Sequence, residues 1–215
     1  NDTPFMVEKV IDYISGQKNS WCVHLSLLRP HPPWIAPEPF NRMYPPAELM
    51  KFNRKERKVD EASQHPFLNE FLNKTGYQAP EDDKKLARLK ASYFGLMSEV
   101  DQNLGVLFDC LKKNDFWNNT LIIFTSDHGE QIGDHWLLGK LGYFDESYHI
   151  PLIIRDPSIH QNKGKIIEEY TENVDVMPTM LDWFDLPLPV QCDGQSLLPF
   201  LKNDKTPSNW RDAAH

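Results

Sequence analysis

The most constraining feature of this chain is an apolar run that stops abruptly at polar residues, Thr120-Leu-Ile-Ile-Phe-Thr-Ser-Asp127-His128-Gly129-Glu. Its β-branched residues predict a buried strand, so Asp127 and His128 would lie at the carboxyl edge of a sheet, where open α/β sheets bind ligands. Gly129 permits a sharp turn and a close backbone approach. A carboxylate beside an imidazole suits a divalent cation. The tripeptide alone is about equally compatible with Asp127 as a helix cap and His128 as a satisfied core side chain.

Two further segments carry side chains suited to chemistry. Residues 133–146 combine glycine, carboxylates, an imidazole and aromatic rings with one ammonium group, Lys140, which is typical of a site loop on a rigid sheet. Upstream, the apolar residues 21–28 predict a strand, and His31 follows it between prolines that restrict the backbone. We therefore expect a second functional imidazole at His31. We interpret His24, inside the predicted strand, as a buried core imidazole.

Helix and strand patterns alternate along the chain and predict a layered α/β fold. Apolar residues at helical spacing predict helices over residues 4–16 and 80–113, while residues 121–125 and 151–157 predict strands. A further helix is expected after Asp175, with Pro178 in its first turn. The apolar stripe of the 80–113 helix predicts packing against a sheet, and its acidic residues Glu99 and Asp101 predict a solvated structural face.

Residues 32–80 form a proline-rich and then charged insertion. Prolines oppose regular strand pairing, so we interpret the segment as a solvated excursion between two core elements. The alternative is that it walls a substrate pocket or contacts a neighbouring subunit. The residues that would do so are Trp34, Phe40, Arg42 and Tyr44.

Composition excludes several classes of partner. A net charge of -8 argues against nucleic acid, whose binding depends on clustered lysine and arginine. No apolar run approaches the roughly eighteen residues that span a bilayer, so a membrane partner is not expected. The three cysteines show no disulfide or zinc spacing, and the chain starts without a signal pattern, so a cytoplasmic location is the expectation.

Taken together, these segments resemble the sulfatase and phosphonate monoester hydrolase branch of the alkaline phosphatase superfamily. The motifs closest to phosphonate monoester hydrolases and phosphodiesterases are Arg29-Pro-His31-Pro-Pro-Trp34 and Gly133-Asp-His-Trp-Leu-Leu-Gly-Lys140-Leu-Gly-Tyr-Phe-Asp145. Residues 93–101 and 172–179 add to the similarity, which covers most of the chain after residue 20. The resemblance implies a three-layer α/β/α sandwich with a mostly parallel sheet, incomplete at its N-terminus.

The resemblance also implies a role for individual residues. It makes Asp127 and His128 metal ligands, and it makes His31 and Lys140 the groups that contact the transferred phosphoryl or sulfuryl oxygens and the leaving-group oxygen. Fixed positive charge at such a centre, and an imidazole able to protonate a departing oxygen, agree with the chemistry. Asp134 and His135 are expected to orient the site residues and not to bind the metal themselves. One imidazole among oxygen ligands favours manganese, iron or zinc over calcium, which prefers oxygen alone.

The chain departs from this family in one important respect. The family nucleophile is a formylglycine made from Cys/Ser-x-Pro-x-Arg, and none of Cys22, Cys110 and Cys192 lies in such a motif. We therefore expect residues 1–215 to be the carboxyl-side part of a catalytic domain, with the formylglycine and further metal ligands in an N-terminal part. With about two of four ligands, the chain alone should bind metal weakly and lack turnover.

Three functions remain in view from the sequence. The leading one is a metal-dependent hydrolase of small phosphonate monoesters or phosphodiesters. A sulfate ester hydrolase using the same residues is the nearest alternative, because sulfuryl and phosphoryl centres share tetrahedral geometry. A non-catalytic metal-binding interaction module is the alternative from another class. The family resemblance also suggests a homo-oligomer.

Overall fold

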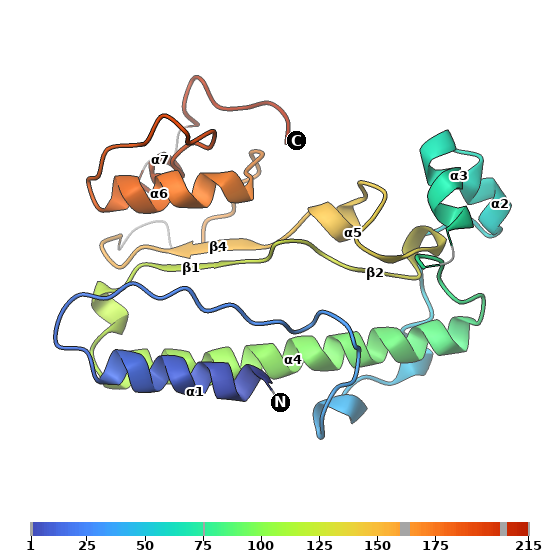
Figure 1. The fold of residues 1–215 in the computed structure, drawn as a ribbon, viewed down its shortest axis with the longest axis horizontal. Coiled ribbons are helices and arrows are strands. Elements are labelled where there is room, and N and C mark those ends of the chain that lie inside the picture. Colours follow the sequence, from blue (N-terminus) through green and yellow to red (C-terminus); the bar gives the residue numbers. More distant parts are fainter. Residues whose placement is uncertain (1, 75, 160–163, 203–205, 215) are drawn as a thin grey trace. The chain divides into compact units, whose positions relative to one another are not determined.

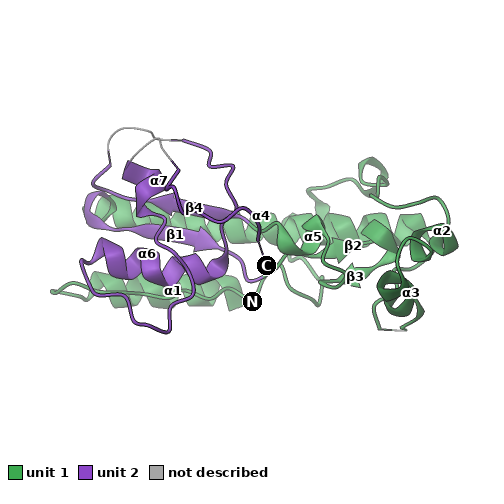
Figure 2. Ribbon diagram, turned by 90° about the horizontal axis from the view of Figure 1, so that it is seen from above, with its two compact units in different colours: residues 1–117, 128–150 green, residues 118–127, 151–215 purple. Residues whose placement is uncertain are grey.

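The structure of the protein is a computed structural model that describes residues 2–74, 76–159, 164–202 and 206–214. The chain divides into two compact units (Figure 2). Unit 1 comprises residues 1–117 and 128–150, and unit 2 comprises residues 118–127 and 151–215. No helix within the described ranges has the length and apolar character needed to cross a membrane.

Two long helices form the framework of unit 1. The helices α1 (Asp2–Ser15) and α4 (Asp83–Lys113) pack side by side (Figure 1). The side chain of Asp82 caps α4 by accepting hydrogen bonds from the backbone N–H groups of Lys84 and Lys85. At the other end, Asn114 donates from Nδ2 to the carbonyl of Cys110 at 2.9 Å. Both predicted helices are therefore confirmed, although α4 begins three residues later than its apolar pattern suggested.

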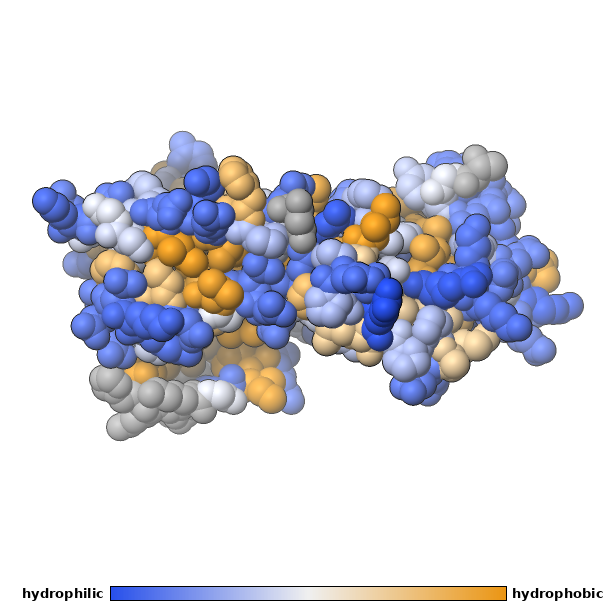
Figure 3. All heavy atoms as spheres, turned by 90° about the horizontal axis from the view of Figure 1, so that it is seen from below, coloured by the Kyte–Doolittle hydropathy of each residue, from blue (hydrophilic) through white to orange (hydrophobic). Residues whose placement is uncertain are grey.

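The apolar stripe of α4 is only partly covered. Leu86, Leu96 and Leu111 are buried, whereas Met97 is 46% exposed. Figure 3 shows hydrophobic patches between hydrophilic side chains on the face seen from below. Glu99, which the sequence placed on a solvated face, is 1% exposed, so that prediction is wrong.

The segment 32–80 contributes to the core of unit 1. It contains α2 (Lys58–Ala62), α3 (Pro66–Asn73) and two short 3-10 helices, Phe40–Arg42 and Pro46–Glu48. Ala36 and Phe40 are buried against Leu96 of α4. The approach is so close that a Cβ at Gly95 would lie 2.5 Å from the Phe40 carbonyl oxygen. The proline-rich part thus packs on a helix rather than projecting wholly into solvent.

A small hairpin and a short helix complete unit 1. The strands β2 (Gln131–Ile132) and β3 (Leu138–Gly139) pair in an antiparallel manner, and α5 (Asp145–Tyr148) follows. Leu137, between the two strands, packs against Leu68 and Leu72 of α3. This contact attaches the hairpin, and the loop that continues from it, to α3.

Unit 2 contains the strand predicted before Asp127. The strands β1 (Ile122–Thr125) and β4 (Leu152–Arg155) pair in an antiparallel manner, with Ile122 opposite Arg155. The helices α6 (Val176–Trp183) and α7 (Leu198–Lys202) follow. Each residue of β1 is half-buried, so the strand is less buried than its apolar sequence predicted.

A buried carboxylate organises the end of unit 2. Asp175 precedes α6, but its side chain does not cap that helix. It accepts instead from the backbone N–H groups of Glu172 at 2.8 Å and Gln195 at 2.9 Å, and it forms an ion pair with Arg211. Burial opposes ionisation of Asp175, but these hydrogen bonds outweigh it and lower its pKa. The residue therefore ties three segments of unit 2 together.

The predicted mostly parallel sheet is not observed within the described residues, where both strand pairs are antiparallel. A parallel sheet needs a neighbouring strand of the same direction, and residues 21–28 were predicted to supply one. In the described part of the chain they alternate between half-buried and exposed as a strand does, but they belong to no paired strand. As a result His24 is exposed, and the prediction of a buried imidazole there is wrong.

Candidate active site

The turn after Asp127 depends on glycine. A Cβ at Gly129 would lie 2.2 Å from the carbonyl oxygen of Glu146, which no other residue type could accommodate without a backbone shift. The close approach allows two backbone hydrogen bonds, from Gly129 N–H to Ser147 O at 2.7 Å and from Glu130 N–H to Glu146 O at 2.8 Å. The close backbone approach predicted at this glycine is confirmed. It fixes the segment that carries His128 against the start of α5.

His128 is held in a single tautomer. Its Nδ1 lies 2.7 Å from the carbonyl oxygen of Gly129, and its Nε2 lies 2.6 Å from Nζ of Lys140. A carbonyl only accepts and an ammonium only donates, so Nδ1 carries the proton and Nε2 presents its lone pair. That lone pair faces a positive charge, which is the arrangement a metal-ligating imidazole requires.

His31 lies beside His128. The two ring centroids are 6.0 Å apart, with an angle of 65° between the ring planes. Nδ1 of His31 is 3.0 Å from the carbonyl oxygen of Pro32, and Arg29 supports the same turn by donating from Nη1 to the Pro33 carbonyl at 2.7 Å. The structure therefore brings together His31, His128 and Lys140, although more than a hundred residues separate the first from the last. Their individual roles stay predictions.

Asp127 belongs to unit 2 and is exposed, directly after β1 and directly before His128 in the chain. Among the described residues, no group of three or more His, Cys, Asp or Glu side chains is arranged to hold a metal ion. Of the two predicted ligands, His128 presents an Nε2 lone pair, a donor that divalent transition metals accept. The assignment of Asp127 as a second ligand stays a prediction.

Glu130 is a further charged group near these residues, and the sequence reasoning missed it. Burial raises the pKa of its carboxyl, while the nearby side chains of His128, His31 and Lys140 oppose that rise. A carboxylate near the Lys140 ammonium balances part of its charge. Its position two residues after His128 was the available signal.

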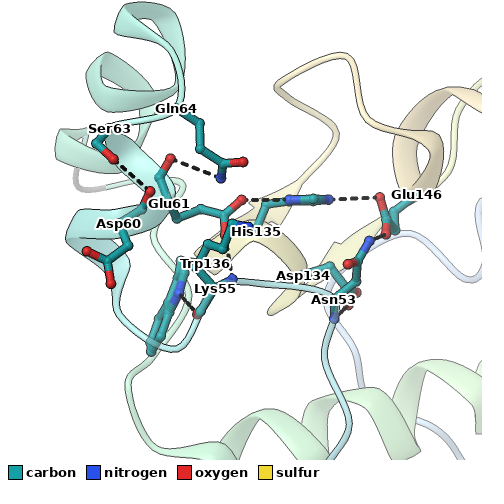
Figure 4. Close-up of polar contacts among 10 residues, drawn as sticks. All are labelled: Asn53, Lys55, Asp60, Glu61, Ser63, Gln64, Asp134, His135, Trp136 and Glu146. Carbon is teal, nitrogen blue, oxygen red and sulfur yellow. Dashed lines mark hydrogen bonds and ion pairs between the residues drawn. The ribbon is translucent and has the colours of Figure 1, made fainter.

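A second cluster surrounds His135, which lies in the turn between β2 and β3 (Figure 4). Nδ1 of His135 is 2.9 Å from Oε1 of Glu61, and Nε2 is 3.4 Å from Oε2 of Glu146. The ring also stacks on Phe144, with centroids 3.6 Å apart and planes 5° from parallel. His135 adopts the left-handed backbone conformation, with a φ of 52°, so this arrangement is held by tertiary contacts.

The carboxylates of this cluster have further partners. Glu61 is 2% exposed and accepts from the backbone N–H of Lys55 at 2.6 Å, and Glu146 accepts from Nδ2 of Asn53 at 2.9 Å (Figure 4). Burial opposes the ionisation of both, but the hydrogen bonds of Lys55 and His135 to Glu61, and of Asn53 to Glu146, outweigh it. The pKa of each carboxyl is therefore lowered.

Asp134 completes the connection between residues 53–55 and the hairpin. Its Oδ1 accepts from the backbone N–H of Asn53 at 2.7 Å, and the Asn53 carbonyl accepts from the His135 N–H at 2.8 Å (Figure 4). Glu146 links the two clusters, because its side chain faces His135 and its carbonyl holds the segment of His128. No sequence signal singled out Glu61 or Asn53, since a charged segment is usually solvated.

The sequence and the structure of the chain were compared with those of known proteins, and both match one family. Residues 2–186 match the Sulfatase family model. A multifunctional alkaline phosphatase superfamily protein of Trinickia caryophylli is 41% identical over the whole chain, and an arylsulfatase of Clostridium perfringens is 29% identical over 99% of it. The phosphonate monoester hydrolase of Agrobacterium radiobacter is 39% identical and superposes on the whole chain with a TM-score of 0.92.

The chain spans 44% of the length of each of these three proteins. Over that span it shares the alkaline-phosphatase-like fold of the phosphonate monoester hydrolase, as its motifs predicted. The family match and the identity to the Trinickia protein together show that the chain belongs to the sulfatase family.

Proposed function

We propose that the full-length protein hydrolyses small phosphonate monoesters and phosphodiesters. The observation that carries this proposal is the grouping of His31, His128 and Lys140 in a chain with this likeness to a phosphonate monoester hydrolase. Lys140 neutralises negative charge on the nonbridging oxygens of the transferred group. His31, whose Nδ1 is engaged by the Pro32 carbonyl, protonates the departing oxygen through Nε2.

His128 and Asp127 would hold part of a divalent metal shell, with manganese, iron or zinc favoured over calcium. A bound metal would stabilise developing negative charge at the reacting centre. Asp134 and His135 would hold the hairpin and the Lys140 loop in position without themselves binding the metal. A formylglycine outside residues 1–215 would supply the nucleophile, so the isolated chain should have no useful turnover.

The second candidate is sulfate ester hydrolysis, which the likeness to the Clostridium arylsulfatase favours. Steady-state rates of the full-length protein on matched 4-nitrophenyl esters of a phosphonate, a phosphate diester and sulfate would separate the two. A larger kcat/KM on the phosphonate and the diester supports the first candidate, and a larger value on the sulfate supports the second. Metal binding without turnover of any ester would support the third candidate, a non-catalytic metal-binding module.

The sequence of the full-length protein before Asn1 offers a direct check. A Cys-x-Pro-x-Arg or Ser-x-Pro-x-Arg motif there would support either hydrolase, and its absence would favour the module. A homo-oligomeric state and a cytoplasmic location are further predictions from the sequence. Light scattering and cell fractionation test them.

A further inference from the structure

Glu130 is a charged residue beside Lys140 that the proposed chemistry does not use. The antiparallel pairing of β2 with β3 sets Gln131 opposite Gly139, and the same register carried one position further sets Glu130 opposite Lys140. Side chains at opposite positions point to the same face of a ladder, with Cβ atoms about 5 Å apart. The two charged groups interact electrostatically. The hairpin therefore places a carboxylate beside the ammonium group of the candidate site.

One oxygen of this carboxylate is available to Lys140. Oε1 of Glu130 is buried, and among the described residues it has no hydrogen-bond partner. It lies close to the residue that precedes Lys140, since a Cβ at Gly139 would be 3.9 Å from it. A buried carboxylate oxygen without a donor costs free energy, and an ammonium group carries three N–H donors. The Lys140 side chain, at the opposite position of the hairpin, can supply that donor.

Lys140 needs such an acceptor once His128 binds a metal ion. Nζ of Lys140 lies 2.6 Å from Nε2 of His128. The Nε2 lone pair cannot bind a metal ion and accept from an ammonium group at the same time. Lys140 is exposed, and a long side chain without an acceptor is spread over many rotamers. A carboxylate at the opposite position of the hairpin would fix the ammonium group again.

We propose that Glu130 is a positioning residue whose carboxylate holds the Lys140 ammonium at the transferred group when His128 binds the metal. The proposal rests on the proposed function. Glu130 does not contact the ester in this role, and it acts only through Lys140. Without the charge of Glu130, Lys140 stays on Nε2 of His128 and competes there with the metal. The loss of that charge therefore matters only while Lys140 is present.

A double-mutant cycle in the full-length protein tests this dependence. Glu130→Gln keeps the shape of the side chain and removes its charge, and it should lower kcat/KM for a 4-nitrophenyl phosphonate about tenfold or more. In a Lys140→Met background the same substitution should lower kcat/KM less than about threefold, because the group that it positions is gone. Glu130→Asp keeps the charge and should retain more activity than Glu130→Gln. Glu70→Gln, at an exposed position of α3, is the control and should leave kcat/KM unchanged.

Metal binding gives a readout that does not depend on turnover. Calorimetric titration with Mn²⁺ alone should show that Glu130→Gln raises the dissociation constant about threefold or more when Lys140 is present and less than about twofold in the Lys140→Met background. Equal losses in both backgrounds, in either measurement, would overturn the positioning role and leave the hydrolase intact. Glu130→Gln that is more active than Glu130→Asp would do the same. Absence of any turnover by the wild-type protein would overturn the proposed function, and the positioning role with it.

Discussion

Two imidazoles in one stretch of unit 1, His128 and His135, have opposite surroundings. His128 uses one nitrogen on the neighbouring carbonyl of Gly129 and turns the other toward the exposed ammonium of Lys140. His135 has both nitrogens on carboxylates and one ring face on Phe144. A histidine anchored locally keeps a nitrogen for a partner that can exchange, whereas one anchored at both nitrogens contributes to the fold. The comparison predicts that His128 matters for chemistry and His135 for stability.

The largest expected effect is on activity at His128. In the full-length protein, His128→Ala should lower kcat/KM by roughly 10³-fold, equivalent to about 4 kcal/mol, because charge stabilisation at the reacting centre would be lost. Steady-state kinetics on a 4-nitrophenyl phosphonate measure this loss, and thermal unfolding should change little because the side chain is only half-buried. His135→Ala is the matched variant and should show the reverse order, a clear loss of stability with a smaller loss of activity. Similar activity losses in both variants would contradict the comparison.

The next effect concerns the stability of the His135 cluster. Glu61→Ala should reduce the free energy of unfolding by about 3 kcal/mol, because it leaves both Nδ1 of His135 and the Lys55 N–H without their buried hydrogen-bond partner. Urea unfolding of the full-length protein measures the change.

The control is the exposed carboxylate of Glu70 on α3, whose Oε1 lies 3.7 Å from Nζ of Lys74. Glu70→Ala should cost less than about 0.5 kcal/mol, because exposed pairs contribute little. If Glu61→Ala were as mild as Glu70→Ala, the cluster could not be what holds residues 53–61 to the hairpin.

A smaller effect is expected where the two clusters meet. Asn53→Ala removes the 2.9 Å hydrogen bond to Glu146 but leaves the Glu146 carbonyl in place on the segment of His128. We expect a loss of about 1 kcal/mol in stability, typical of one hydrogen bond to a charged group that keeps other partners. Asn53→Asp serves as the sharper variant, because it places a second negative charge beside Glu146 and should destabilise more than alanine. Unfolding midpoints that rank the two variants in the opposite order would refute this assignment.

The sequence predicted the local parts of this molecule well. The run before Asp127 gave a strand because its residues are β-branched and apolar, and Gly129 gave a close backbone approach because no Cβ fits there. Helical spacing predicted α1 and α4, and the family motifs placed the chain in the right family. These features depend on residues that are close in sequence or on complete motifs. The periodicity and spacing of the residues are therefore enough to predict them.

Features that depend on distant partners were not predictable. Glu99 and Glu61 are carboxylates on helices, for which solvation is the usual outcome, yet both are buried. The predicted parallel pairing is not observed in the described part of the chain, where residues 21–28 show strand-like exposure without belonging to a paired strand. Pairing is decided by which segments meet, and local sequence does not carry that information. The Glu61–His135 contact joins residues 74 positions apart, and nothing in either local sequence marks it.

The smallest expected effect is on the pH dependence of stability, and it concerns the two carboxylates that face His135. The pKa of Glu61 and that of Glu146 are lowered in the folded protein from an ordinary value of 4.5. The unfolded chain therefore takes up these protons more readily. The stabilising contribution of the two carboxylates is complete above that value and is lost as the pH falls through the lowered pKa values.

Glu61→Gln removes one of the two titrations. Thermal unfolding of the full-length protein from roughly pH 6 to pH 3 should show a shallower fall in Tm for this variant than for the wild type. Because His128→Ala keeps Glu61 and Glu146 and their contacts with His135, it should leave most of the wild-type slope in place. A change there as large as that of Glu61→Gln would show that the two imidazoles are not divided between chemistry and fold.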